Sequence, residues 1–193
     1  SRRQRQMCIR DSVRSLSRSS KKKEIYCLAT NYNPGIAEVC KDMAVADIND
    51  PETVKIYAKK KKISFAIIGP ENPLANGVAD ALFDIGVESV GPKKDLAQIE
   101  TSKSFTRNLL TEYKIPGCPK FKTFSSMEGV EEILGELGDY YVVKYDGLAG
   151  GKGVKVAGDH LHSHSEAISY CKELINSGGT FVIEKKLIGE EFS

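Results

Sequence analysis

The sequence predicts an α/β protein in two parts: a doubly wound unit with a parallel sheet, then a small α+β subdomain with an antiparallel sheet. In the first part, short apolar runs alternate with helical segments, as in parallel sheets covered by helices. In the second, β-branched runs follow one another across glycine-rich turns. The doubly wound unit lacks the buried strand and glycine-rich turn with which such units begin, so we expect it to be truncated at its start.

We expect four segments along the chain. Residues 1–12 (SRRQRQMCIRDS) have no apolar periodicity, and we interpret them as a non-native tail; the alternative, a basic RNA-binding arm, lacks interleaved aromatic residues. Residues 13–97 form the doubly wound unit. Residues 98–119 form a connector and the start of a second core, and residues 120–193 form the antiparallel subdomain. Because the chain stops at a charged strand end, we expect this core to be truncated after Ser193.

Helix signals and one apolar run define the first part. Asp50 is placed to cap a helix, and Pro51 suits its first position. The run 65–69 (FAIIG) is apolar throughout, as a strand buried on both faces should be. The predicted series is a helix remnant over 13–22, a strand over 24–30, a turn over 31–35, a helix over 36–41, a strand over 43–46, a helix from 51 to about 61, a strand over 65–69, a helix over 74–85 and a strand over 87–90.

The second part begins with a helical stretch that is broken near Thr101. A stiff connector over 115–119 (IPGCP) follows it. The predicted elements are helices over 95–100, 102–113, 128–137 and 165–176 and strands over 121–124, 140–145, 154–157 and 180–187.

Composition excludes several classes of function. A net charge of +2 provides no field that would favour nucleic acid. No run of 18 apolar residues and no signal-peptide pattern is present, so we expect a cytoplasmic protein without a membrane partner. The cysteines at 8, 27, 40, 118 and 171 form no C-x-x-C pair, and we expect reduced core residues. His160, His162 and His164 alternate, but carboxylates are sparse nearby, so we expect exposed side chains rather than a metal site.

The most informative stretch is 142–156 (VVKYDGLAGGKGVKV), which reads as strand, loop and strand. Lys144 on the strand and Lys152 in the loop add positive charge, and Asp146 is the one carboxylate. The loop glycines are Gly147, Gly150, Gly151 and Gly153. Glycines let backbone N–H groups approach a ligand with no Cβ in the way. Amides and ammonium groups together suit a polyphosphate.

The loop fits neither familiar phosphate motif. Gly151-Lys152 is followed by Gly153 instead of serine or threonine, which excludes a Walker A loop, and the next element is a strand, which excludes the dinucleotide fingerprint. We therefore expect a mobile hairpin over phosphates. The alternative is a hairpin whose glycines only make the turn, although such turns usually need one or two glycines.

Two other segments are candidates on weaker grounds. The group Gly69, Pro70, Glu71 and Pro73 follows an apolar strand, where open α/β sheets collect ligands; a strand–helix turn shaped by proline explains it equally well. Lys103 on its helix would by itself be a solvated side chain. The segment 181–191 is a strand that runs into a charged turn. Its extended backbone could bind the hydrogen-bonding edge of an adenine, or the charged strand end could simply be solvated.

Together these residues resemble the ATP-grasp ligases, and among them the phosphoribosylamine–glycine ligase (glycinamide ribonucleotide synthetase) family. Their detailed sequence is most similar to that of archaeal members. The resemblance covers roughly residues 13–193. Its carriers are NPGIA (33–37), IIGPENPLANGVADAL (67–82), VGPKK (90–94), QIETSKSF (98–105), YKIPGCP (113–119), VVKYDGLAGGKGVKV (142–156) and VIEKKLIGEEFS (182–193).

The resemblance implies that ATP, with Mg²⁺ or Mn²⁺, drives ligation of glycine to 5-phosphoribosylamine through a glycyl phosphate. It implies that Lys103 and Lys144 contact phosphates and that 147–153 forms the lid of the ATP-grasp subdomain. It further implies that Glu184, Lys185 and Leu187 frame the adenine, that Glu191 holds the ribose, and that Gly69 to Pro73 face the phosphoribosylamine.

The family's first strand and its glycine-rich turn are absent, and the resemblance places the metal ligands beyond Ser193. We therefore assign no catalytic or metal-binding residue here and expect an inactive fragment of a monomeric parent. The alternatives are another ATP-grasp carboxylate–amine ligase or a non-catalytic module that binds ATP.

Overall fold

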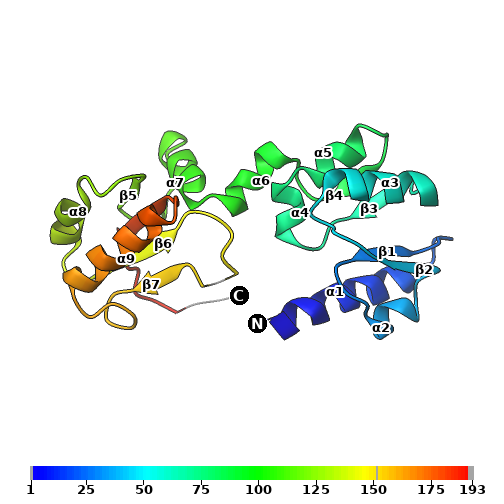
Figure 1. Ribbon diagram of the computed structural model, residues 1–193, viewed down its shortest axis with the longest axis horizontal. Helices are drawn as coiled ribbons and strands as arrows, with labels where there is room; N and C mark the ends of the chain where they lie inside the picture. Colours follow the sequence, from blue (N-terminus) through cyan, green and yellow to red (C-terminus); the bar gives the residue numbers. More distant parts are fainter. Residues whose placement is uncertain (1, 151, 191–193) are drawn as a thin grey trace. The chain divides into compact units, whose positions relative to one another are not determined.

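The computed structural model describes residues 2–150 and 152–190, with side chains from Ile9 onward. The chain forms two compact units, residues 1–97 and 98–193. Helix α6 (Lys94–Thr101) spans the boundary between them. Figure 1 labels the helices and strands of each unit.

The first unit alternates strands and helices, as the sequence predicts. Its elements are α1 (Arg2–Ser17), β1 (Tyr26–Ala29), α2 (Pro34–Ala37), β2 (Asp42–Val45), α3 (Pro51–Lys61), β3 (Phe65–Ile67), α4 (Glu71–Ala75), α5 (Val78–Phe83) and β4 (Glu88–Val90). Strand β1 pairs with β2 and β3 with β4, both in parallel. The predicted parallel class is confirmed. The described strands form two separate two-stranded sheets, however, instead of one continuous sheet.

One side of the β3–β4 pair packs on the unit's larger core. This core consists of Ala58, Val78, Leu82 and Val87, with Ala66 among the partly buried residues packed against it. On the strands, Phe65 and Ile67 are 53% and 44% exposed. The prediction that 65–69 is a buried strand is therefore wrong for these two residues. The physical reason is that β3 has one neighbouring strand and that the core covers only one of its faces.

Two helix boundaries also differ from prediction. Helix α1 runs from Arg2 to Ser17, so most of the segment interpreted as a non-native tail without apolar periodicity is helical, and the helix ends before 18–22. The helix predicted over 74–85 is two helices, α4 and α5. Gly77 separates them with a left-handed φ of 84° that a continuous helix cannot contain. The Asp50 cap of α3 is confirmed, because its carboxylate accepts from the Glu52 and Thr53 N–H groups.

The second unit is built on one antiparallel sheet. Its elements are α7 (Lys103–Glu112), β5 (Phe121–Phe124), α8 (Val130–Leu137), β6 (Tyr141–Tyr145), β7 (Val154–Val156), α9 (His164–Asn176) and β8 (Phe181–Lys185). The strand order is β5-β8-β6-β7, and every neighbouring pair is antiparallel. This confirms the predicted antiparallel subdomain.

The alternation of side chains along β6 and β8 gives this sheet two different faces. Tyr141 and Val143 oppose Lys185 and Ile183 in register, and this side carries the core shared with α8 and α9. Lys144 and Glu184 belong to the other set of alternating residues. Lys144 lies opposite Val182 and Glu184 lies opposite Val142. Arg107 on α7 pairs with Glu184. A dry core thus lies on one side of the sheet and a polar cluster on the other.

Candidate functional site

The glycine-rich loop joins two paired strands, as predicted. Val142 on β6 faces Val156 on β7, and the Tyr145 N–H donates to the Gly153 carbonyl over 2.7 Å. The Asp146 N–H donates to the carbonyl of Thr180, just before β8, over 2.8 Å. Both ends of the loop are therefore fixed to the sheet by backbone hydrogen bonds.

Several glycines in and near the loop pack closely against one residue, Tyr145. A Cβ at Gly147 would lie 2.8 Å from Cε1 of Tyr145, and one at Gly153 would lie 2.9 Å from its Cβ. Gly179, before β8, would place a Cβ 2.7 Å from Cε2 of the same ring. Contacts this short do not occur in folded proteins. Close packing around Tyr145 therefore explains Gly147 and Gly153, for which the sequence suggested ligand approach or, as the alternative, the turn itself.

Asp146 ties the loop to the start of helix α7. Its carboxylate accepts from the backbone N–H groups of Lys103, over 2.6 Å, and Ser104, over 3.2 Å. The Ser102 hydroxyl donates to its other oxygen over 3.3 Å. The negative charge lies at the positive end of the helix, where it is stabilised. Asp146 is therefore a helix cap rather than an anion facing into the loop.

The same contact brings Lys103 to the loop. Its ammonium donates to the Gly147 carbonyl over 3.0 Å. Burial lowers the pKa of Lys103 below its ordinary value, although the Asp146 carboxylate opposes this effect. Since burial disfavours the charged form, an anion placed nearby would restore its stability.

Glu184 is a buried carboxylate held by two cations. The residue is 5% exposed. Arg107 binds both of its oxygens, from Nε to Oε2 over 2.7 Å and from the terminal nitrogen Nη2 to Oε1 over 3.2 Å. The Lys144 ammonium shares Oε1. Burial raises the pKa of Glu184, but the hydrogen bonds from Arg107 and Lys144 together outweigh it and hold the pKa below its ordinary value.

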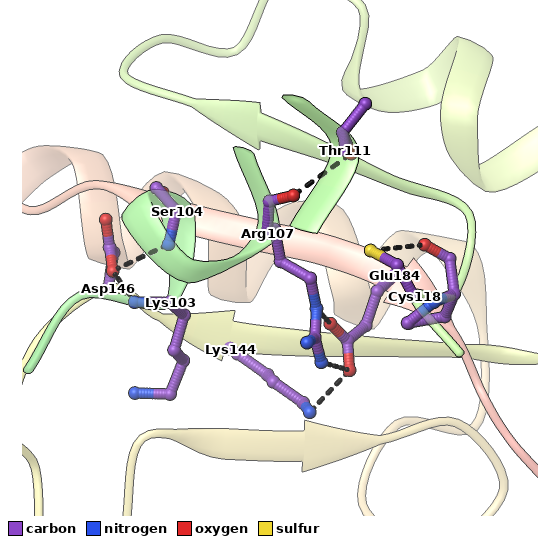
Figure 2. A network of polar contacts seen from close by, with 9 residues as sticks. Lys103, Ser104, Arg107, Thr111, Cys118, Lys144, Asp146 and Glu184 are labelled. Atoms are coloured by element: carbon purple, nitrogen blue, oxygen red, sulfur yellow. Dashed lines mark hydrogen bonds and ion pairs between the residues drawn. The ribbon is translucent and has the colours of Figure 1, made fainter. Parts of the chain in front are cut away.

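Three predicted residues thus meet in one cluster of the second unit. Figure 2 shows Lys103, Lys144 and Glu184 near one another, with the ammonium of Lys144 directed to Glu184 and that of Lys103 directed away from it. Three cations, counting Arg107, accompany the carboxylates of Asp146 and Glu184, which leaves one positive charge in excess. Such a cluster can bind an anion.

Sequence reasoning missed Arg107 entirely. The signal was available, because Arg107 follows Lys103 by four residues on one helix and such residues share a face. What the sequence could not show is that this face meets the middle of β8.

The remaining candidates of this unit are less constrained. Lys152 and Lys185 are exposed, and Leu187 is 68% exposed. Gly150 has a left-handed φ of 59°. Three residues that carry predictions, Gly151, Glu191 and Ser193, lie outside the described residues. The lid glycine, the ribose contact and the end of the core at Ser193 therefore stay predictions.

The second candidate group belongs to the first unit. Pro70 precedes α4, Glu71 begins it, and Pro73 is buried within it, while Gly69 is exposed. Proline has no N–H, so Pro73 offers no backbone donor at the start of this helix.

The histidines and cysteines are only partly as predicted. His160 and His162 are exposed. His164 is half-buried; its Nε2 lies 3.0 Å from the Gly138 carbonyl and its ring packs edge-on against Tyr141. Cys171 is a core residue whose pKa burial raises to about 12. Cys27, Cys40 and Cys118 are half-buried, not core, and these four thiols are free.

Within the described residues, no three His, Cys, Asp or Glu side chains are arranged to hold a metal ion. Among the helices of 2–150 and 152–190, none combines the length and apolar character needed to cross a membrane.

Two family models together match nearly the whole chain. Residues 11–100 match the N domain of phosphoribosylglycinamide synthetase, and residues 101–193 match its ATP-grasp (A) domain. Phosphoribosylamine–glycine ligase from Methanococcoides burtonii is 43% identical over 98% of this chain, which spans 43% of that relative's length. The Methanocaldococcus jannaschii enzyme of the same name is 45% identical over 88% of the chain, which spans 40% of its length.

Solved structures agree in fold. An N5-carboxyaminoimidazole ribonucleotide synthetase in complex with ADP has a TM-score of 0.70 at 18% identity, over 92% of this chain and 44% of its own. Phosphoribosylamine–glycine ligase from Thermotoga maritima has a TM-score of 0.66 at 21% identity, over 87% of this chain and 45% of its own. The two adjacent family matches and the relatives of the same name show that this chain belongs to the phosphoribosylglycinamide synthetase family.

Proposed function

We propose that the protein of which this chain forms part ligates glycine to 5-phosphoribosylamine at the expense of ATP, giving glycinamide ribonucleotide. The glycine carboxylate would take the terminal phosphoryl group of ATP, and the amine of phosphoribosylamine would then displace phosphate from the glycyl phosphate. The observation that carries the proposal is the cationic cluster at the base of the glycine-rich loop, in a chain of this family.

The residues of the cluster suit the polyphosphate of ATP. Lys103 and Lys144 come from different elements, a helix and a strand, and would place two ammonium groups on the phosphates. Loop 147–153 would close over them as the lid. Glu184, Lys185 and Leu187 would frame the adenine, the last two through backbone groups, and Glu191 would hold the ribose.

The first unit would contribute the other substrate's site. Gly69, Pro70, Glu71 and Pro73 would face the phosphoribosylamine. We propose 13–97 as the substrate domain, 98–119 as the connector and start of the ATP-grasp core, and 120–193 as the lid subdomain, in a cytoplasmic, monomeric protein. Residues 1–12 would be the non-native tail.

The described residues do not fit a magnesium or manganese ion. Asp146 is engaged as a helix cap, and Glu184 is engaged by two cations, so neither carboxylate is available as a ligand. We derive no step through a metal and propose that its ligands lie beyond Ser193.

ADP release tests the reaction. The whole protein should release ADP only when ATP, glycine and phosphoribosylamine are all present, whereas the 193-residue chain should bind ATP without turnover. ADP release without glycine would contradict the proposed reaction, and turnover by the chain alone would contradict the expectation that it is inactive.

Calorimetric titration with ATP tests the site in this chain. Lys103→Met and Lys144→Met should each weaken ATP binding by about tenfold or more, because each removes a charge from the phosphates. Lys155→Met is the matched control, because Lys155 lies on the adjacent strand with its ammonium over the Tyr170 ring, 3.8 Å from its centre. Equal effects from all three variants would contradict the site.

A further inference from the structure

Lys144 has one observed partner, Glu184, and one proposed partner, a phosphate of the nucleotide. Its ammonium is bound to Oε1 of Glu184, yet the proposed function requires it to bind a phosphate. A buried carboxylate that loses its counter-ion is strongly destabilised. Lys144 can therefore leave Glu184 only if another cation continues to pair with that carboxylate.

Arg107 is placed to be that cation. Its guanidinium contacts both carboxylate oxygens, at 2.7 and 3.2 Å, whereas Lys144 contacts one. A planar guanidinium satisfies a carboxylate by itself, and it does not lose its charge on burial. The Lys144 and Arg107 side chains are similarly exposed, at 24% and 22%, so the choice of Lys144 as the partner that moves rests on its single contact to Glu184 against two from Arg107.

The third cation of the cluster is engaged elsewhere. The Lys103 ammonium donates to the Gly147 carbonyl, and its backbone N–H is held by Asp146. Figure 2 shows Arg107 reaching Glu184 from helix α7 while Lys144 approaches the same carboxylate from the strand.

We propose that Arg107 is a positioning residue that keeps Glu184 paired, so that Lys144 can transfer its ammonium from Glu184 to a phosphate of the bound nucleotide. The inference rests on the nucleotide site proposed above. Arg107 itself touches no phosphate in this scheme. It determines whether Lys144 is released.

A double-mutant cycle tests the release. ATP and adenosine are titrated into the wild-type chain, Arg107→Met, Lys144→Met and the double variant, with far-UV circular dichroism to verify folding. Lys144→Met should weaken ATP binding about tenfold in the wild-type background but less than about threefold when Arg107 is already Met, because Lys144 then stays on Glu184. Adenosine, which has no phosphate, should bind Lys144→Met within about threefold of wild type.

A rescue separates this role from a structural one. Adding Glu184→Gln to Arg107→Met removes the charge that retains Lys144, so ATP affinity should return to the level of Glu184→Gln alone. Because Glu184→Gln also removes a buried unpaired charge, the rescue is measured on variants that circular dichroism shows to be folded, and a residue that acted through contacts other than Glu184 would not be rescued. Should Arg107→Met fail to fold, Arg107→Lys replaces it in the double-mutant cycle. The expected loss of ATP affinity is then smaller, because a lysine ammonium cannot bind both carboxylate oxygens as the planar guanidinium does.

The outcomes are distinguishable. Equal Lys144→Met effects in both backgrounds, or equal losses of ATP and adenosine binding in Arg107→Met, would overturn the role of Arg107 and leave the nucleotide site intact. A folded wild-type chain that binds no ATP would overturn both.

Discussion

The two units of the chain contain strands of similar length but bury them differently. In the second unit, Val143, Phe181 and Ile183 have no solvent exposure. In the first, Phe65 and Val90 are more than half exposed although they are as apolar. An antiparallel sheet is covered adequately by helices on one face, whereas parallel strands need cover on both. An apolar run therefore specifies a strand, but its burial depends on the sheet in which the strand lies.

The largest contrast should come from one phenylalanine in each unit. Phe181→Ala should destabilise the second unit by about 3–5 kcal/mol, because Phe181 is fully buried and stacks on Phe124 with ring centres 5.2 Å apart. Phe65→Ala should cost less than about 1 kcal/mol, because Phe65 is already half exposed. Urea unfolding, with hydrogen exchange as the probe of each unit, measures the two losses in the free energy of unfolding. Similar costs would remove the distinction between the units.

The buried carboxylate of the second unit should make its stability depend on pH. Glu184→Gln should cost about 2–3 kcal/mol at neutral pH, less than for a fully buried pair because Arg107 and Lys144 remain partly exposed. The pKa of Glu184 is lower in the folded chain than the ordinary 4.5, so its contribution is present above that pH and is lost as the pH falls through the folded pKa.

Urea unfolding of wild type and Glu184→Gln at neutral pH and near pH 3 measures this difference. The two stabilities should converge at the lower pH. A difference in the free energy of unfolding that stays constant with pH would mean that the charge of the Glu184 carboxylate contributes nothing to stability.

Packing around Tyr145 predicts an intermediate effect. Gly153→Ala should destabilise the second unit by about 1–3 kcal/mol, because the new Cβ would lie 2.9 Å from the β-carbons of both Tyr145 and Ala149. Gly189→Ala is the matched control, since no atom lies within 4 Å of its Cβ position. Thermal unfolding compares them. If Gly153→Ala left the stability unchanged, packing against Tyr145 would not explain this glycine, and close approach of a ligand to the backbone would remain as its reason.

The smallest effect should be stabilising. Gly135 lies inside helix α8 with open space at its Cβ position. Gly135→Ala should therefore stabilise the second unit by about 0.5–1 kcal/mol through helix propensity. Differential scanning calorimetry detects such a gain as a higher melting temperature. A loss instead would show that this helix surface is constrained by packing.

Local signals were enough to predict most elements. Asp50 and Pro51 marked the start of α3, and the break near Thr101 separates α6 from α7. The prediction was wrong where non-local contacts decide, as in the exposure of Phe65. For the site, Lys103, Lys144 and Glu184 were predicted, but the ion pair between Lys144 and Glu184 was not, and Arg107 was missed.

The sequence by itself determined the order of strands and helices, the parallel and antiparallel halves, and the glycine-rich loop with its lysines, because these are recorded in the spacing of consecutive residues. Tertiary structure alone decided that Asp146 caps α7, that Tyr145 fills the space beside three glycines, and that Arg107 holds Glu184. The reason is distance along the chain: Arg107 and Glu184 are 77 residues apart, and only the register of the sheet and the placement of a helix bring their charges together.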